Sequence, residues 1–162
     1  MAQKPQMPLM SQRAFSVAGI RQVKKYTKEH EWIELSSDNK IGLLNFPLGI
    51  RPTLTGMAGT IGVSTYAAKS LGDVVYVELP SIDLEVGAGD AIGAVESVKS
   101  ASDIMTPVSG KITETNGVLE EKPGTINKGP ETDGWIAKIE VKDPTEMDGL
   151  MSGEDYAKFT EE

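Results

Sequence analysis

One lysine, Lys99, lies in a stretch of small and apolar residues, AVESVKSASDIM at 94–105. Glu96 precedes it by three positions and Asp103 follows it by four. Three interpretations are open: a solvated lysine in a turn, a catalytic amine, or a lysine to which a cofactor is attached. A catalytic amine needs a pKa lowered by burial or by nearby cations, whereas the two acids favour the protonated form. The neighbouring residues therefore disfavour the catalytic amine.

The chain offers few other side chains for chemistry. It has no cysteine, which excludes disulfides, thiolate nucleophiles and cysteine metal sites, so any redox disulfide would have to come from a cofactor. His30 is its single histidine, and no G-x-S-x-G motif accompanies it. A zinc site built on histidines and a hydrolase triad are therefore disfavoured. For His30 and the nearby Trp32, packing beside the first strand is favoured over a chemical role.

Composition narrows the class of partner. The 162 residues are enough for one domain, and the net charge is -8. Proteins that bind nucleic acid present a basic face, so no nucleic-acid partner is predicted. No apolar run reaches about 18 residues, so no membrane partner is predicted either. A partner with a basic surface is favoured instead, although an ordinary solvated acidic face would give the same composition.

The amino-terminal segment differs in charge from the rest of the chain. Residues 1–28 contain six lysines and arginines and no acid. This pattern is typical of an organelle-targeting peptide, and RAFS at 13–16 fits a mitochondrial processing site after Phe15. We predict a targeting peptide and basic tail over 1–25, one domain over 26–162, and location in the mitochondrial matrix.

Turn and cap signals predict the elements around Lys99. Ser64 can cap a helix over 65–71, and Gly72 suits its end. The alternation in DVVYVELP at 73–80 predicts a half-buried strand that Pro80 ends.

The same signals outline the rest of the fold. The other predicted elements are a strand at 31–36, a hairpin with arms at 91–98 and 101–108, a strand at 135–141 and a terminal helix within 149–162. Lys99 falls at the bend of the hairpin, where its amine is held away from the core. Many short strands with little helix predict an all-β barrel or sandwich.

The stretch GDAIGAVESVKSASDIMTPVSGKI resembles the modification hairpin of lipoyl-carrying domains. ESVK, followed by small residues and Asp and then by P-x-S-G, resembles more specifically the glycine cleavage system H proteins. Further stretches match that family in order along most of the chain: YTKEHEW, GVSTYAAKSLGDVVYVELP, KPGTIN, DGWIAKIEV and EDYAKF. Biotin carriers place their lysine between two methionines, whereas Val98 and Ser100 flank Lys99. Lipoyl domains of 2-oxoacid dehydrogenases commonly have Asp just before the lysine and lack the HEW and DGWIAKI segments.

The resemblance implies a mainly β fold, the flattened lipoyl-type barrel or barrel-sandwich hybrid, with a short helix near 65–71 and a carboxy-terminal helix. It implies that lipoate is covalently attached to Lys99 as N6-lipoyllysine. It implies that the lipoylating enzyme recognises Glu96. Glu31 and Asp103 match acids that line the cleft holding the loaded arm, where a carboxylate can bind a protonated amine through a charge-assisted hydrogen bond.

The resemblance also implies a carrier that is not an enzyme. The partners would be glycine decarboxylase (P protein), which contains pyridoxal phosphate, the tetrahydrofolate-dependent aminomethyltransferase (T protein), dihydrolipoyl dehydrogenase (L protein) and the lipoylating enzyme. Lipoate would carry the aminomethyl group of glycine from P protein to T protein, and L protein would reoxidise it. An alternative is a relay protein that donates lipoate to 2-oxoacid dehydrogenases. A structural relative with an unmodified lysine is a third possibility.

The family pattern is interrupted at 41–59, IGLLNFPLGIRPTLTGMAG, to which no element can be assigned. Members of the family run almost directly from the DNK turn to TIGVSTYAA. We interpret 41–59 as an insertion, hypothetically a mis-spliced or mis-predicted exon, which transcript sequencing across codons 38 to 62 would decide. Hairpin loops are short, so an insertion here is expected to loosen the pairing of the first strand.

Overall fold

The computed structural model describes residues 24–36 and 57–161. Most of the predicted targeting peptide at 1–25 and most of the interpreted insertion at 41–59 lie outside the described residues. The last three positions of the interpreted insertion, 57–59, form the start of a strand. Within the described ranges, no helix has the length and hydropathy needed to cross a membrane.

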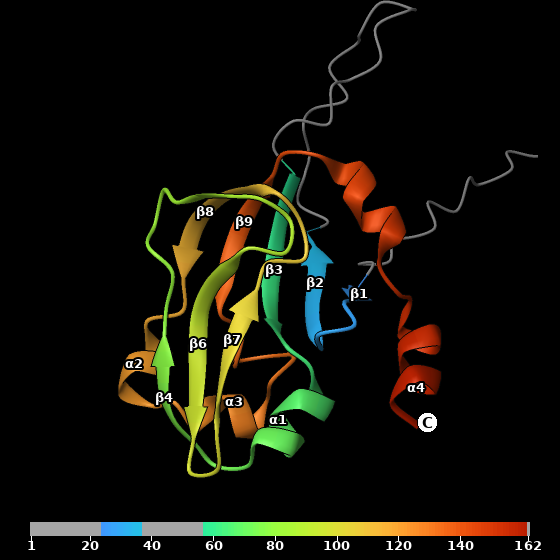
Figure 1. Cartoon of the computed structure of the whole chain (residues 1–162). Helices are drawn as coiled ribbons and strands as arrows, with labels where there is room; N and C mark the ends of the chain where they lie inside the picture. The colour runs from blue at the N-terminus through green and yellow to red at the C-terminus, as the bar shows by residue number, and fades with distance from the viewer. Residues whose placement is uncertain (1–23, 37–56, 162) are drawn as a thin grey trace, which may run out of the picture.

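Two antiparallel sheets make up most of the fold (Figure 1). The larger has the strand order β1-β2-β3-β9-β8-β5. Its strands are β1 (Lys24–Tyr26), β2 (Glu31–Leu35), β3 (Met57–Val63), β9 (Ala137–Val141), β8 (Gly110–Thr115) and β5 (Glu85–Val86). The smaller has the order β4-β6-β7, with β4 (Val74–Glu78), β6 (Ala91–Ser97) and β7 (Ala101–Met105). The predicted mainly β class, with one short and one carboxy-terminal helix, is confirmed.

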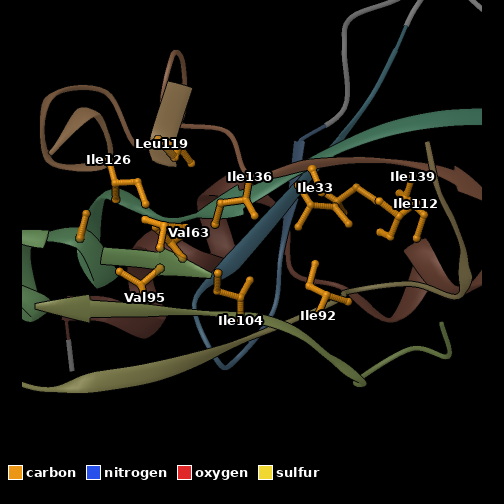
Figure 2. Close-up of a cluster of buried hydrophobic side chains, with 14 of the residues drawn as sticks. Ile33, Val63, Ile92, Val95, Ile104, Ile112, Leu119, Ile126, Ile136 and Ile139 are labelled. Carbon is orange, nitrogen blue, oxygen red and sulfur yellow. The ribbon is translucent and has the colours of Figure 1, made fainter. Parts of the chain in front are cut away.

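The core lies between the two sheets and is almost entirely aliphatic. In Figure 2, Ile33 and Ile139 of the larger sheet lie near Ile92 and Ile104 of the smaller one. Each such side chain contributes roughly 1.5–3 kcal/mol when it is fully buried. The inward-facing aliphatic residues therefore hold the sheets against each other and fix the position of the β6–β7 hairpin.

The sequence patterns missed several elements of the larger sheet. β1, β3, β5 and β8 were not predicted as separate strands. In β3 the glycines Gly59 and Gly62 weaken the strand signal because they have no side chain to alternate. All five residues of β2 pair with β3, from Glu31 opposite Val63 to Leu35 opposite Gly59. The expected loosening of this pairing is therefore not seen in the described residues.

The helices divide in the same way into predicted and missed ones. Helix α1 (Thr65–Leu71) has the predicted bounds, the Ser64 hydroxyl accepts from Ala67 N, and Gly72 follows with a φ of 77°. The carboxy-terminal helix α4 (Gly153–Glu161) lies within the predicted segment. Three short helices were not predicted: α2 (Val118–Glu121), α3 (Thr125–Lys128) and the 3-10 helix η1 (Pro144–Gly149).

The strict alternation predicted for 73–80 is wrong. Val74 and Val77 are buried, whereas Val75 and Tyr76 between them are both exposed. The register of β4 against β6 shifts between Val74 and Tyr76, which is a β-bulge. A bulge adds one residue to a strand, so two consecutive side chains no longer alternate between faces.

A half-buried acid outside the core, Glu131, holds the start of α1. Glu131 Oε1 accepts hydrogen bonds from Thr65 N and Thr65 Oγ1, both at 3.0 Å. Its Oε2 accepts from Tyr26 Oη at 2.8 Å and lies 3.4 Å from Lys24 Nζ. Burial raises the pKa of Glu131, but these hydrogen bonds and the Lys24 charge outweigh burial, so the net pKa lies below its usual value.

Replacement of Gly110 tests the close approach of β8 and β9. A Cβ at Gly110 would lie 2.2 Å from the Glu140 carbonyl oxygen. We expect Gly110→Ala to lower the free energy of unfolding by about 1–3 kcal/mol, the usual cost of overpacking. Gly117→Ala is the control, since a Cβ there meets no atom within 4 Å. Denaturant unfolding measures both variants, and equal stabilities would contradict this account of Gly110.

The Glu131 hydrogen bonds predict a pH-dependent stability. A carboxyl group whose pKa is lowered by folding stabilises the protein above its unfolded pKa, and this contribution is lost as pH falls through the folded pKa. At pH 7, Glu131→Gln should cost about 1–3 kcal/mol through lost charged hydrogen bonds. The difference from the wild type should shrink as pH falls below the reference value of 4.5. Urea unfolding between pH 7 and pH 3 measures it, with exposed Glu120→Gln as control. A constant difference would rule out this role of the charge.

Candidate functional site

Lys99 lies at the tip of the β6–β7 hairpin, as predicted. Ser97 N donates to Ser100 O at 2.8 Å and closes the turn. The Ser97 hydroxyl also accepts from Lys99 N at 3.1 Å and from Ser100 N at 3.0 Å. Val98 N donates to Asp73 O at 3.1 Å, which joins the tip to the residue before β4. The backbone of the tip is therefore held by hydrogen bonds within the turn and by one to the segment before β4.

The Lys99 side chain, by contrast, is exposed. Among the described residues, no hydrogen-bond or ion-pair partner is found for its amine. The side chain lies beside Gly72, because a Cβ at Gly72 would be 3.2 Å from Lys99 Cε and 3.4 Å from Nζ. A free amine on a fixed backbone can be reached by an enzyme that modifies it.

Glu31 is buried, with 3% of its surface exposed. Its Oε1 accepts from Met105 N at 3.1 Å, and its Oε2 accepts a short hydrogen bond from the Thr27 hydroxyl. Met105 belongs to β7, an edge strand of the smaller sheet. Glu31 therefore links the larger sheet to the strand that leads from Lys99.

A cleft of about 230 Å³ lies between α1, β2 and the β6–β7 hairpin. Both predicted acids, Glu31 and Asp103, line it, and Ser100, the residue after Lys99, lines it too. The other lining residues are Glu29, His30, Val63, Ala67, Ser70, Leu71, Val95, Ser102 and Ile104. The structure thus brings Glu31 and Asp103 to one cleft that begins beside the tip.

Glu96 is not part of this cleft. It is exposed on β6, opposite Ala101 on β7 and Tyr76 on β4. Successive residues of a strand face opposite sides, and the preceding residue, Val95, is buried and lines the cleft. Glu96 is therefore placed to meet a partner that approaches the outer face of the smaller sheet.

His30 and Trp32 pack as the sequence favoured. The Trp32 ring is buried, and its Nε1 donates to Val63 O at 2.9 Å. His30 Nδ1 lies 2.8 Å from Tyr156 Oη of α4, in hydrogen-bond contact, and Tyr156 Oη lies 2.7 Å from the Ser64 hydroxyl. Burial raises the pKa of Tyr156, so its hydroxyl stays protonated.

Sequence reasoning missed the small residues of the cleft wall, Ala67 and Ser70 on α1 and Ser102 on β7. Small side chains after Lys99 and along a capped helix were the only signal for a hollow there. A second cleft, of about 450 Å³, was also missed, and it shares Glu29 and Glu31 with the first.

Comparison with known proteins gives consistent matches. Residues 53–162 match the family described as Glycine cleavage H-protein. Glycine cleavage system H protein 2, mitochondrial, of Arabidopsis thaliana is 40% identical over 94% of this chain and 85% of its own. The glycine cleavage system H protein of Carboxydothermus hydrogenoformans is 43% identical over 85% of this chain and 92% of its own.

A solved structure agrees with these matches. The crystal structure of a glycine cleavage system H protein from Mycobacterium marinum superposes with a TM-score of 0.67 at 31% identity. It covers 86% of this chain and 97% of that one. Family pattern, identity and fold lead to one conclusion: the chain belongs to the glycine cleavage H-protein family.

Proposed function

We propose that this protein is the lipoylated carrier of the glycine cleavage system, with lipoate attached to Lys99. The observation that carries the proposal is the exposed amine at the hydrogen-bonded tip of the β6–β7 hairpin, in a chain of this family. The protein takes the aminomethyl group of glycine from P protein to T protein and is then reoxidised by L protein. It performs no catalysis itself, because the reactions belong to the cofactors of these enzymes.

The residues around Lys99 fit a lipoyl group. The amine has no partner among the described residues, so acylation breaks no ion pair there. The neighbouring cleft combines apolar side chains, such as Val63 and Leu71, with small polar ones. Lipoate supplies a disulfide, which the cysteine-free chain lacks. Carrier chemistry at Lys99 thus needs a group of this kind.

Glu31 and Asp103, together with Glu29, are the acids that line the cleft. Each carboxylate oxygen has two lone pairs, and each Glu31 oxygen has one protein donor, so further hydrogen bonds can be accepted. A protonated amine that enters the cleft therefore meets Glu31 and Asp103, and Glu29 lines the same cleft. The walls also exclude water from the bound group, which slows its premature release.

The mitochondrial matrix is the proposed location. Residues 1–28 carry bases without acids, and the Arabidopsis thaliana relative is named as mitochondrial. We also retain the interpretation of residues 41–59 as an insertion, which the transcript test addresses.

Mass spectrometry of the endogenous protein tests the attachment. We expect a lipoyl group on the Lys99 peptide and an amino terminus at or near Ser16. Lys99→Arg should abolish the modification, because a guanidinium stays protonated and is a poor nucleophile. Lys69→Arg, at an exposed position of α1, is the matched control and should retain lipoate on Lys99. An unmodified Lys99 in cells replete with lipoate would refute the carrier proposal.

Glu96→Gln tests recognition in the same assay. It should slow lipoylation while leaving the fold unchanged, since Glu96 is exposed.

Asp103→Asn tests the role of the cleft after lipoylation. The protein is first loaded with the aminomethyl group by P protein and glycine, and P protein is then removed. Loss of one charged hydrogen bond should speed the release of ammonia from the loaded protein by roughly tenfold. The extent of Lys99 lipoylation should not change, because Asp103 is not at the tip. Asp148→Asn is the control for a lost surface charge. Equal release rates in the two variants would show that Asp103 does not shelter the group.

A further inference from the structure

The β-bulge in β4 places two large side chains in solvent beside the modification hairpin. Val74 pairs with Ser97 and Tyr76 with Glu96, so Val75 is the extra residue. Val75 is 54% exposed and Tyr76 is 53% exposed. A regular strand would turn one of the two toward the core. Bulges are enriched next to functional sites, where they redirect side chains.

These side chains adjoin the tip that bears Lys99. Val98, the residue before Lys99, is 69% exposed, and its backbone N–H binds the Asp73 carbonyl. Tyr76 lies opposite Glu96 in the β4–β6 register. We call Val75, Tyr76, Glu96 and Val98 the tip patch.

The chemistry at Lys99 indicates which partner covers the tip patch. In acylation the reacting atom is Lys99 Nζ itself, so the modifying enzyme must place its active site directly at the tip. In the later reactions the reacting atoms lie at the far end of the attached group, and those enzymes can meet that group away from the tip. A surface contiguous with Lys99 therefore serves acylation best.

The charges around the tip patch specify the partner surface. Asp73 and Glu78 are exposed at the two ends of β4, and Glu96 lies within the patch. A partner with an apolar or aromatic centre and basic residues around it would complement this surface. Tyrosine is among the residues that carry most binding energy in such interfaces.

We propose that the tip patch is the docking surface of the lipoylating enzyme. This rests on the proposed function, in which Lys99 is acylated. In that step Nζ loses a proton and attacks the carboxyl carbon of an activated lipoyl donor, here lipoyl adenylate. An amide bond forms, the bond from that carbon to the adenylate phosphate oxygen breaks, and AMP leaves.

A double variant, Val75→Thr with Tyr76→Thr, tests the proposal while keeping residues that suit a strand. Initial rates of transfer from lipoyl adenylate by the purified lipoylating enzyme are measured against the concentration of unmodified protein. We expect kcat/KM to fall about tenfold or more, chiefly through KM, as for loss of an interface anchor. Ile82→Thr is the matched control, since Ile82 is 58% exposed between β4 and β5, and its rate should equal that of the wild type.

A second readout separates this enzyme from the other partners. The variants are lipoylated to completion by long incubation. The rate at which P protein exchanges carbon dioxide with the carboxyl group of glycine is then measured in the presence of each variant. Exchange at the wild-type rate is expected. An unchanged kcat/KM for lipoylation would overturn the docking surface, and so would an equal loss in both assays. If the double variant fails to fold, Val98→Thr, outside the strands, decides by the same criteria. Absence of lipoylation on wild-type Lys99 would instead overturn the proposed function.

Discussion

The buried carboxylate of Glu31 joins the two sheets beside the cleft, and the shape of the site depends on it. A charge removed from water is tolerated only when it is hydrogen-bonded. Here the Thr27 hydroxyl and the backbone N–H of Met105 supply the bonds. Met105 lies on an edge strand, so Glu31 also satisfies an N–H that would otherwise lack a strand partner. The same interaction sets the spacing between β2 and β7, which form two walls of the cleft.

The strand β6 serves two surfaces at once. Val95 faces inward and lines the cleft, while Glu96 is exposed on the outer side with Tyr76 of β4. This division follows from the period of two in a strand. In the proposed function, this division allows the hairpin to present one surface for modification of Lys99 and another that shelters the attached group, without any movement of the backbone.

The sequence predicted best where local chemistry determines structure. The bounds of α1 followed from Ser64 and Gly72, and the position of Lys99 at the hairpin tip followed from two flanking β-rich segments. β3 was missed because its glycines carry no pattern, and the bulge at Val75 was missed because it depends on pairing with β6. These features are set by tertiary contacts, which single-strand patterns do not contain.

The site was predicted unevenly for the same reason. The residues next to Lys99 in the sequence were enough to single it out. Glu31 and Asp103 lie far apart in sequence, and only the family resemblance suggested that they share a cleft. The small residues of the cleft wall gave almost no sequence signal, because a cleft forms where elements that are distant in sequence pack around a space. The positions of these residues therefore depend on the tertiary structure.

The start of the cleft at Ser100, directly after Lys99, determines how weakly the cleft can bind. A group attached to Lys99 is tethered at the cleft entrance, which gives it an effective concentration on the order of millimolar. A dissociation constant near 1 mM, about 4 kcal/mol, is then enough to keep the group sheltered much of the time. Such weak binding leaves the group available to any enzyme that offers a better site. In the proposed carrier, the short tether thus lets one cleft protect the attached group without competing with the enzymes that receive it.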